Sequence, residues 1–397
     1  MFKGGAAFES EVTESFEGID SISFLLADDG DYYRYKQKSE LIKIMVKGIY
    51  NEEFLNLKRQ TGDPAADAFI NYVFADQERK HQLRRWLEGK ATAADLDSMF
   101  PGFEFIACAR ELPLWADKKL ISAGQAFFAQ HAQDIMTLLG LLSLPYCYTA
   151  ADGAMVLYLS EKIRKQTTKR LYDTAVFVWD VMAPEAFAKG GSAFSDILRI
   201  RLVHSAVRFY TLQSGTWDEN LGTPINQEDM AGTNLSFSLI VVRGLRKLGV
   251  QISNAEQIAF LHIWKVVGYF SGLDEDLLPE NGKMATQLDL AIKKRHFRSS
   301  THGQELTKSL IEHILKVNRR KVSNNDILGL MRHLLGSDVA DMLKVPGPEL
   351  PRYKLTLLRA MKFFKSFSRE GNSNHLYYKA YSAFKKQNRE LQQREFS

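Results

Sequence analysis

Hydrophobic residues recur along this chain at spacings of three and four positions, with polar residues between them. A period of about 3.6 residues is typical of amphipathic α-helices packed against a core. Runs of alternating β-branched residues are scarce, so the pattern favours helices over strands. It predicts helices over Lys36–Lys47, Ala66–Glu88, Gly124–Leu144, Val156–Met182, Ala193–Thr211, Asn234–Leu248, Ala255–Phe270, Gln304–Val317, Ile327–Leu335 and Leu355–Phe367.

Glycine and proline interrupt the chain where helices are expected to end. The breaks are Gly62-Asp63-Pro64, Pro101-Gly102, Lys189-Gly190-Gly191, Gly222-Thr223-Pro224, Leu278-Pro279 and Pro346-Gly347-Pro348. We find no internal repeat or long linker. We therefore expect an all-α fold with an N-terminal helical region (1–100), a central region (101–285) and a basic C-terminal helical region (286–397), packed together as one unit.

The composition is that of a soluble globular protein, with 45% hydrophobic and 25% charged residues. The net charge of +5 is uneven, because residues 281–397 hold 23 Lys and Arg against 10 Asp and Glu. A solvated basic surface is the simplest interpretation, and peripheral contact with a membrane or an acidic partner is the alternative. The aromatic residues of this region fit core packing best, and we expect no nucleic-acid partner.

Cys108 and Cys147 lie among apolar residues and show no metal-ligand spacing, which predicts two reduced thiols. The N-terminus lacks the basic-then-apolar pattern of a signal peptide. The longest apolar stretch, Ile135–Thr149, is too short to span a bilayer. We therefore expect a cytoplasmic protein without a transmembrane segment. No phosphate-binding loop, dinucleotide-binding glycine pattern or nucleophile elbow occurs.

The segment 193–211 carries the strongest chemical signal. Arg201, His204 and Arg208 fall on one stripe of the predicted helix, with Ile200 and Val207 beside them. An imidazole on an apolar helix face could ligate a haem iron, and the guanidinium groups could bind the two propionates. The alternative is a core histidine between two ion-paired arginines, and spacing alone favours that alternative.

Other candidates are weaker by themselves. Arg170 and Thr174 share a helix face, but a salt bridge and a bond from the threonine to the preceding turn would explain them equally. Asn226 and Asp229 lie where a turn meets a helix and are expected to cap it. His262 is a second candidate iron ligand, and a core position is the simpler interpretation.

Taken together, these segments resemble the catalytic domain shared by the rubber oxygenases (latex-clearing proteins) and the fungal mycophenolic-acid pathway oxygenase. The resemblance covers residues 130–285. It depends on the order and spacing of Arg170…Thr174, Arg201-x-x-His204-x-x-x-Arg208, Gly222-Thr223-Pro224-Ile225-Asn226-Gln227-x-Asp229 with Thr233, Leu248-Gly249, His262-x-Trp264 with Gly268, and Leu277-Leu278-Pro279.

The resemblance implies a globin-like helical core around a b-type haem, with further helices at both ends, and places that core within residues 101–285. It implies His204 as the axial ligand of the haem iron. The implied reaction uses dioxygen to cleave carbon–carbon double bonds of an apolar, isoprenoid or unsaturated lipid-like substrate. The remaining implied site residues are Arg201, Arg208 and Thr233 for cofactor binding and Arg170, Thr174 and Asp173 for catalysis.

One departure bears on the substrate. The rubber-cleaving members, as the resemblance implies, carry a lysine where this chain has Asp173, and a glutamate base in the region that here reads Gly153-Ala154-Met155. Asp152 borders this region, and Glu161 is the nearest glutamate. These differences argue against rubber itself and favour a small apolar substrate.

Other classes of protein remain open. A di-iron carboxylate oxygenase needs two Glu-x-x-His units, and the chain offers only Glu78-x-x-His81 within a run of charges. A non-catalytic haem-based sensor and a haem-free lipid-binding protein would use the same helices. The sequence does not specify the oligomeric state.

Overall fold

The structure is a computed structural model that describes residues 48–159, 167–318, 322–367 and 372–395. Contacts divide the chain into two units, 1–51 and 52–397, and the described helices belong to the second. The described ranges are predominantly helical and contain no β-strand, which confirms the predicted all-α class. The predicted helix Lys36–Lys47 lies outside the described residues.

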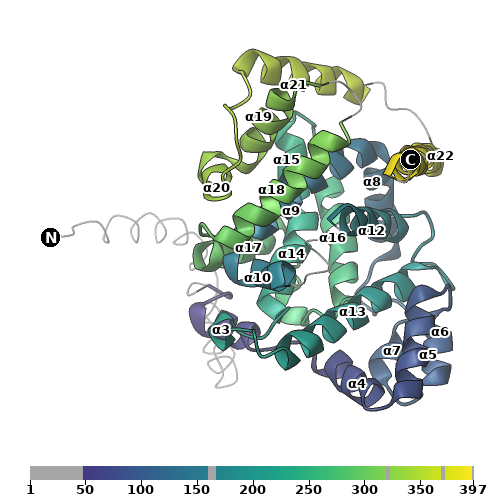
Figure 1. Ribbon diagram of the computed structural model, residues 1–397. Helices are drawn as coiled ribbons and strands as arrows, with labels where there is room; N and C mark the ends of the chain where they lie inside the picture. Colours follow the sequence, from purple (N-terminus) through teal and green to yellow (C-terminus); the bar gives the residue numbers. More distant parts are fainter. Residues whose placement is uncertain (1–47, 160–166, 319–321, 368–371, 396–397) are drawn as a thin grey trace, which may run out of the picture. The chain divides into compact units, whose positions relative to one another are not determined.

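The helices follow one another with short connections (Figure 1). The first part of the chain forms α3 (Glu52–Arg59), α4 (Pro64–Phe74), α5 (Gln77–Glu88), α6 (Ala93–Met99) and α7 (Glu104–Cys108). The central part forms α8 (Lys118–Leu138), the π-helical η1 (Leu139–Ser143), α9 (Leu144–Thr149), α10 (Ala151–Leu159), α12 (Thr167–Val181), α13 (Ala193–Gln213), the 3₁₀ turn η2 (Glu219–Leu221), α14 (Gln227–Phe237), α15 (Leu239–Lys247), α16 (Asn254–Phe270) and the 3₁₀ turn η3 (Glu275–Leu277). The last part forms α17 (Gly282–His296), α18 (Thr301–Lys316), α19 (Asn324–Leu335), α20 (Ser337–Met342), α21 (Arg352–Phe367) and α22 (Ser373–Glu395).

Helices α8 and α16 pack closely along each other in the core. Their backbones approach at Gly124, where a Cβ atom would lie 2.7 Å from the carbonyl oxygen of Ala259. Phe127 and Phe260 fill the same interface, with ring centroids 5.1 Å apart. A small residue in one helix and aromatic rings beside it thus set how closely the two helices cross.

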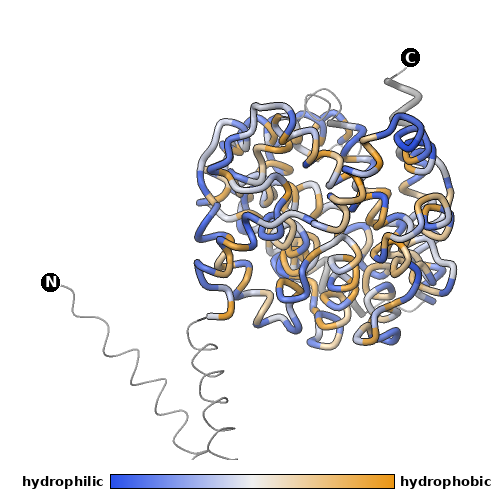
Figure 2. The backbone as a smooth tube through the Cα atoms, turned by 90° about the horizontal axis from the view of Figure 1, so that it is seen from below, coloured by the Kyte–Doolittle hydropathy of each residue, from blue (hydrophilic) through white to orange (hydrophobic). Residues whose placement is uncertain are grey.

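Hydrophobic and hydrophilic residues alternate at short intervals along the helices (Figure 2). This is the pattern of helices that bury one stripe and expose the other. None of the described helices is long and apolar enough to cross a membrane.

Capping residues divide some helices at positions where the hydrophobic pattern predicted one continuous helix. The predicted helix Ala66–Glu88 is wrong as a single element, because Asp76 starts a new helix by accepting a hydrogen bond from the Arg79 amide at 2.9 Å. The predicted helix Asn234–Leu248 is likewise divided at Ser238, between α14 and α15. The predicted element 193–211 is confirmed as α13 to within two residues.

Candidate functional site

Arg201 fastens α13 to the beginning of α4. Its Nε and Nη2 atoms donate to the two carboxylate oxygens of Asp63 at 2.6 and 2.9 Å. The Asp63 side chain also accepts a hydrogen bond from the Ala66 amide and so caps α4. The Arg201 guanidinium lies over the ring of Phe105, 4.8 Å from its centroid. The Arg201 fork is therefore occupied by a carboxylate from the protein itself.

Arg208 joins α13 to α4 and to the loop before α14. It donates through Nε to the carbonyl of Pro224 at 2.9 Å and through Nη2 to that of Ile225 at 2.8 Å. Its Nη1 pairs with Asp67, and the residue is only 2% exposed. Like Arg201, Arg208 uses its donors to fix the position of α13.

His204 lies between these two arginines on α13. Burial and the positive charge of Arg208 lower its pKa to about 4, so the imidazole is neutral near pH 7. Its Nδ1 atom is buried and has no hydrogen-bond partner among the described residues. A neutral ring with an unused nitrogen has the chemistry that a metal ligand requires.

The apolar residues beside His204 are incompletely covered. Ile197 is fully buried, but Ile200 and Val207 are half-buried and Val203 is 42% exposed. An apolar stripe left partly open beside a half-buried imidazole fits contact with an apolar ligand.

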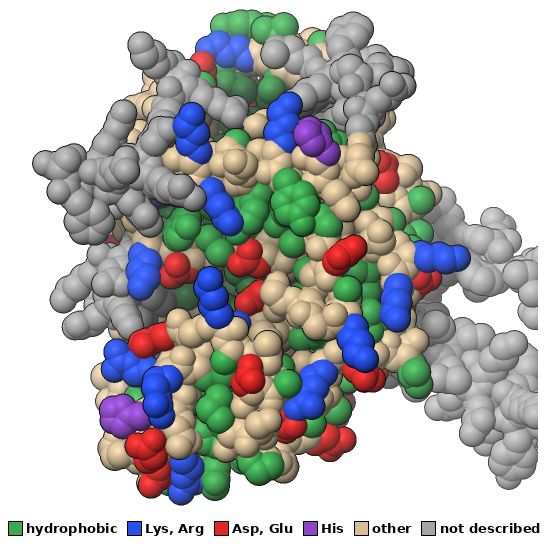
Figure 3. All heavy atoms as spheres, turned by 90° about the vertical axis from the view of Figure 1, so that its right-hand side faces the viewer, with side chains coloured by type: hydrophobic (Ala, Val, Ile, Leu, Met, Phe, Trp, Pro, Cys, Tyr) green, Lys and Arg blue, Asp and Glu red, His purple; other side chains and the backbone are tan. Residues whose placement is uncertain are grey.

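Helix α12 packs against α13 and shows the same incomplete burial. None of its described side chains from 168 to 177 is fully buried, although Leu171, Val176 and Phe177 are apolar. Figure 3 views the side of the molecule that carries α12 and α22, and shows hydrophobic side chains gathered in the middle of this face between charged ones. Both α12 and α13 therefore carry apolar side chains that are incompletely buried.

Arg170 points from α12 to α9. Its Nη2 donates to the hydroxyl of Tyr148, and its guanidinium lies 5.7 Å from the centroid of that ring. Its Nε atom is buried without a hydrogen-bond partner among the described residues. Thr174 donates to the carbonyl of Arg170 at 2.9 Å, which is the bond to the preceding turn considered above. Asp173 is exposed, and partial burial raises its pKa against the opposing charge of Lys169.

Thr233 lies near Arg170 through a shared neighbour, Cys147. The hydroxyl of Thr233 donates to the carbonyl of Asp229 at 2.9 Å, and both Thr233 and Ser236 approach the Cys147 thiol. Burial raises the pKa of that thiol in spite of these contacts, so it is protonated at neutral pH. The structure thus brings Arg170 and Thr233 together, whereas no hydrogen bond or ion pair of the described residues joins His204 to either.

His262 has a different environment. Its Nε2 accepts a hydrogen bond from the Asp117 amide at 2.9 Å, just before α8, and its ring meets Trp115 edge-on. Burial lowers its pKa and keeps the ring neutral, as an acceptor requires. The geometry explains His262 as a residue that stabilises the start of α8.

The turn before α14 holds several segments in register and contains the cap that the sequence predicted. Asn226 caps α14 by accepting from the Asp229 amide at 2.8 Å. The buried Gln227 donates to the carbonyls of Gly62 and Gly272 and accepts from the Asp274 amide, each at 2.8 Å. This arrangement fixes α14, and with it Thr233, relative to α4 and α16.

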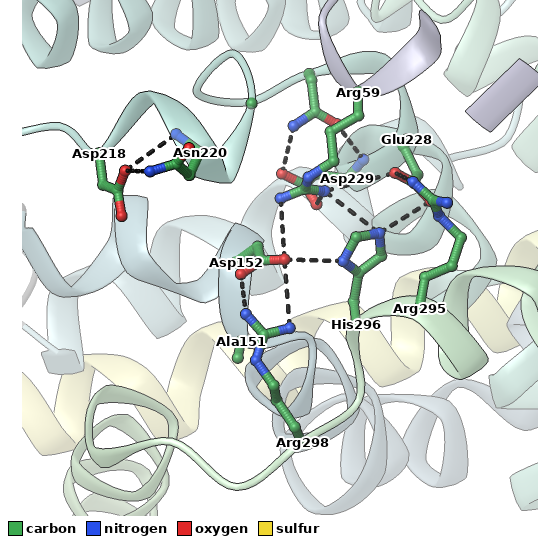
Figure 4. A network of polar contacts seen from close by, with 12 residues as sticks. Arg59, Ala151, Asp152, Asp218, Asn220, Glu228, Asp229, Arg295, His296 and Arg298 are labelled. Atoms are coloured by element: carbon green, nitrogen blue, oxygen red, sulfur yellow. Dashed lines mark hydrogen bonds and ion pairs between the residues drawn. The ribbon is translucent and has the colours of Figure 1, made fainter. Parts of the chain in front are cut away.

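A buried network of charged residues lies beside this turn and was not predicted (Figure 4). At its centre, the His296 ring lies 3.0 Å from the Asp152 carboxylate and 2.9 Å from that of Glu228. Arg59 reaches Asp229 at 3.1 Å, and Glu228 at 3.5 Å. The other members are Arg295 and Arg298.

Within the network, the pKa of each group depends on the charges and hydrogen bonds of the others. Burial alone would lower the pKa of His296, but its hydrogen bonds to Asp152 and Glu228 outweigh burial and raise it. Burial would raise the pKa values of both carboxyls, and hydrogen bonds from His296 and the arginines lower them. Of these residues the sequence singled out only Asp152 and Asp229, because the members come from segments between 59 and 298 that share no spacing signal.

The rival di-iron interpretation finds no support in the described residues. Glu78 and His81 lie on the largely exposed α5, where Glu78 pairs with Arg85 at 3.6 Å. Nor do three His, Cys, Asp or Glu side chains converge on a metal position anywhere in the described ranges.

Comparison with known proteins identifies a family and a similar fold. Residues 129–365 match the family model described as "ER-bound oxygenase mpaB/B'/Rubber oxygenase, catalytic domain". A curated rubber oxygenase from Streptomyces sp. (strain K30) is 27% identical over 243 residues, which are 60% of this chain and 59% of that protein. The fold is similar to that of latex clearing protein in its closed state, with a TM-score of 0.69 and 23% identity over 81% of this chain and 90% of that one.

Proposed function

Because the chain belongs to the family of the mpaB-type and rubber oxygenases, we propose that it is a haem-b-dependent oxygenase. The proposed substrates are dioxygen and an apolar molecule of isoprenoid or unsaturated lipid type. The proposed reaction is oxidative cleavage of a carbon–carbon double bond, in which each alkene carbon becomes a carbonyl carbon. The chain matches about 59% of its curated relative, so activity and substrate are proposals for this chain.

His204 carries the proposal. It is neutral, it has a buried nitrogen without a partner among the described residues, and it lies on a partly open apolar stripe of α13. These are the properties required of an imidazole that binds a haem iron against a porphyrin. When bound, the haem would supply the iron at which dioxygen is activated.

We assign the other predicted cofactor residues supporting roles. Arg201 and Arg208 fix α13, and with it His204, through Asp63 and Asp67. Thr233 is exposed on α14 near Cys147 and is available to a bound molecule. On α12, Arg170, Thr174 and Asp173 remain the proposed catalytic group, with partly open apolar side chains beside them to receive an alkene.

The region around Gly153 supports a substrate other than rubber. A Cβ atom at this position would lie 2.8 Å from the carboxyl carbon of Asp229, so α10 packs directly on that carboxylate. Position 153 therefore has no room for a glutamate. Together with Asp173 on α12, this packing supports our preference for a small apolar substrate.

The test is the visible spectrum of the purified protein, oxidised and reduced, beside His204→Ala, His262→Ala and His81→Ala. We expect an intense Soret band in the wild type that collapses only in His204→Ala. His81, on the exposed surface of α5, is the matched control for loss of an imidazole. A band that persists in His204→Ala would move the ligand elsewhere. No band after haem supplementation would favour a haem-free lipid-binding protein.

A further inference from the structure

Arg170 differs from the other arginines that keep a buried nitrogen without a hydrogen-bond partner. Arg59, Arg199 and Arg332 also have one such nitrogen, but each of them pairs with at least one carboxylate. Within the described ranges, Arg170 has no ion pair, and its polar contact is the neutral hydroxyl of Tyr148. Arg170 is thus a partly buried cation to which the described residues supply no anion.

The groups around Arg170 do not supply the missing negative charge. Burial raises the pKa values of both Tyr148 and Cys147, so the phenol and the thiol are neutral near pH 7. The carboxyl that influences the Cys147 thiol, that of Asp229, is paired with Arg59 at 3.1 Å. Asp173 is on the same helix but is exposed.

An unpaired guanidinium in such surroundings is costly, because burial removes water from a charge that no anion compensates. The ring of Tyr148 offsets part of this cost, since its face attracts a cation 5.7 Å away. The free Nε–H leaves one side of the planar fork able to donate to a carboxylate in the paired geometry that arginine favours. The sequence predicted Arg201 and Arg208 as the residues that bind carboxylates of the ligand. Their guanidinium groups are already paired with Asp63 and Asp67.

We infer that Arg170 is the receptor for a carboxylate of a molecule bound beside α12, where Arg170 meets Tyr148 of α9. This inference deepens the proposed function and rests on it. The carboxylate has two candidate sources: the substrate, which would then be an isoprenoid or unsaturated acid, and a propionate of the haem. Both sources present the same planar anion to the same fork.

The experiment compares wild type with Arg170→Gln, Arg170→Lys and Lys169→Gln. Lys169→Gln removes the same charge from an exposed neighbour and serves as the matched control. Haem affinity is measured by titrating the apoprotein with haemin. Ligand affinity is measured by calorimetry with geranylgeranoic acid and with geranylgeraniol, which share one hydrocarbon chain. Circular dichroism melts verify that each variant is folded.

Loss of a charge-assisted hydrogen bond predicts a change of about tenfold or more. If the carboxylate comes from the substrate, Arg170→Gln lowers the affinity for the acid by that factor. Its affinities for the alcohol and for haemin then equal those of the wild type. If a propionate is the source, the same variant weakens haem binding instead. Arg170→Lys keeps the positive charge but loses the planar guanidinium group. Its affinity should therefore lie between those of the wild type and Arg170→Gln. It is also the variant to use if Arg170→Gln does not fold.

The inference is overturned if folded Arg170 variants bind haemin and the acid within twofold of the Lys169→Gln control. Failure of the proposed function would give a different result. A wild-type protein that does not bind haemin would refute the proposal that this chain is a haem-dependent oxygenase. The acid and the alcohol still test Arg170 in that protein, and absence of an Arg170-dependent preference for the acid then refutes the inference as well.

Discussion

At the scale of single residues, the charge balance around His296 determines how the folded protein responds to pH. The imidazole is held between Asp152 and Glu228, and these two contacts raise its pKa against the effect of burial. A group whose pKa is higher in the folded than in the unfolded protein stabilises the fold while it is protonated. That contribution is fully present below the ordinary pKa of histidine and disappears as the pH rises through the folded value.

His296→Gln should therefore lower the free energy of unfolding most at acidic pH. We expect a loss of about 3 kcal/mol there, because the substitution removes one partner of a buried ion pair. The difference from wild type should shrink as the pH rises above the folded pKa of His296. Urea unfolding followed at several pH values measures it, with the exposed His81→Gln as control. A loss that stays constant across the pH range would show that His296 is not charged in the folded protein.

The same scale shows where inference from sequence stops. Spacing placed Arg201, His204 and Arg208 on one helix, and α13 does carry them together. It did not reveal that the two arginines are paired, because their partners Asp63 and Asp67 precede them by 138 and 141 residues. Spacing reports which side chains share a face, whereas only tertiary structure shows which of them still have free donors.

At the scale of elements, α17 is a helix that the sequence missed, and its buried stripe is partly polar. Helix α17 buries Leu288 and Ile292 along the same stripe as Asp289 and His296, which weakens its hydrophobic period. Helices α8, α13 and α16 bury mainly apolar residues, and their central segments were predicted. His296 of the charged network belongs to this polar stripe, so the network is one cause of the weak hydrophobic period of α17.

The crossing of α8 and α16 yields a second stability prediction. Gly124→Ala would place a methyl group 2.7 Å from the carbonyl oxygen of Ala259, so one backbone must move. We expect a loss of about 1–3 kcal/mol, which is typical of overpacking. Gly232→Ala in α14 is the control, because its nearest atom, on Ile292, would lie at 3.4 Å. Equal urea midpoints for the two variants would contradict the close approach.

At the scale of the whole molecule, the candidate site depends on helices from both ends of the described chain. Arg59 of α3 and His296 of α17 hold α14 through the charged network. Near the C-terminal end of the described chain, α22 packs on α8 and places aromatic rings against Trp179 of α12. The helices that carry the candidate site residues are therefore supported by elements that carry none of these residues.

Tyr377 is the residue through which this dependence can be measured. It is 1% exposed, it donates to the carbonyl of Trp179 at 2.8 Å, and its ring lies 5.4 Å from that of Trp179. Tyr377→Ala should cost about 3–5 kcal/mol of unfolding free energy, as for other large buried aromatic residues. The adjacent Tyr378, which is 59% exposed, provides the matched control Tyr378→Ala.

The two variants should also differ in local dynamics. If α22 supports α12, Tyr377→Ala will speed hydrogen exchange along Thr167–Val181 more than along α4, which α22 does not support. Haem or ligand binding to α12 should restore part of that protection, because a bound molecule stabilises the structure that it requires. Equal exchange in α12 and α4 after the substitution would mean that Tyr377 stabilises the core generally and leaves the site region independent of α22.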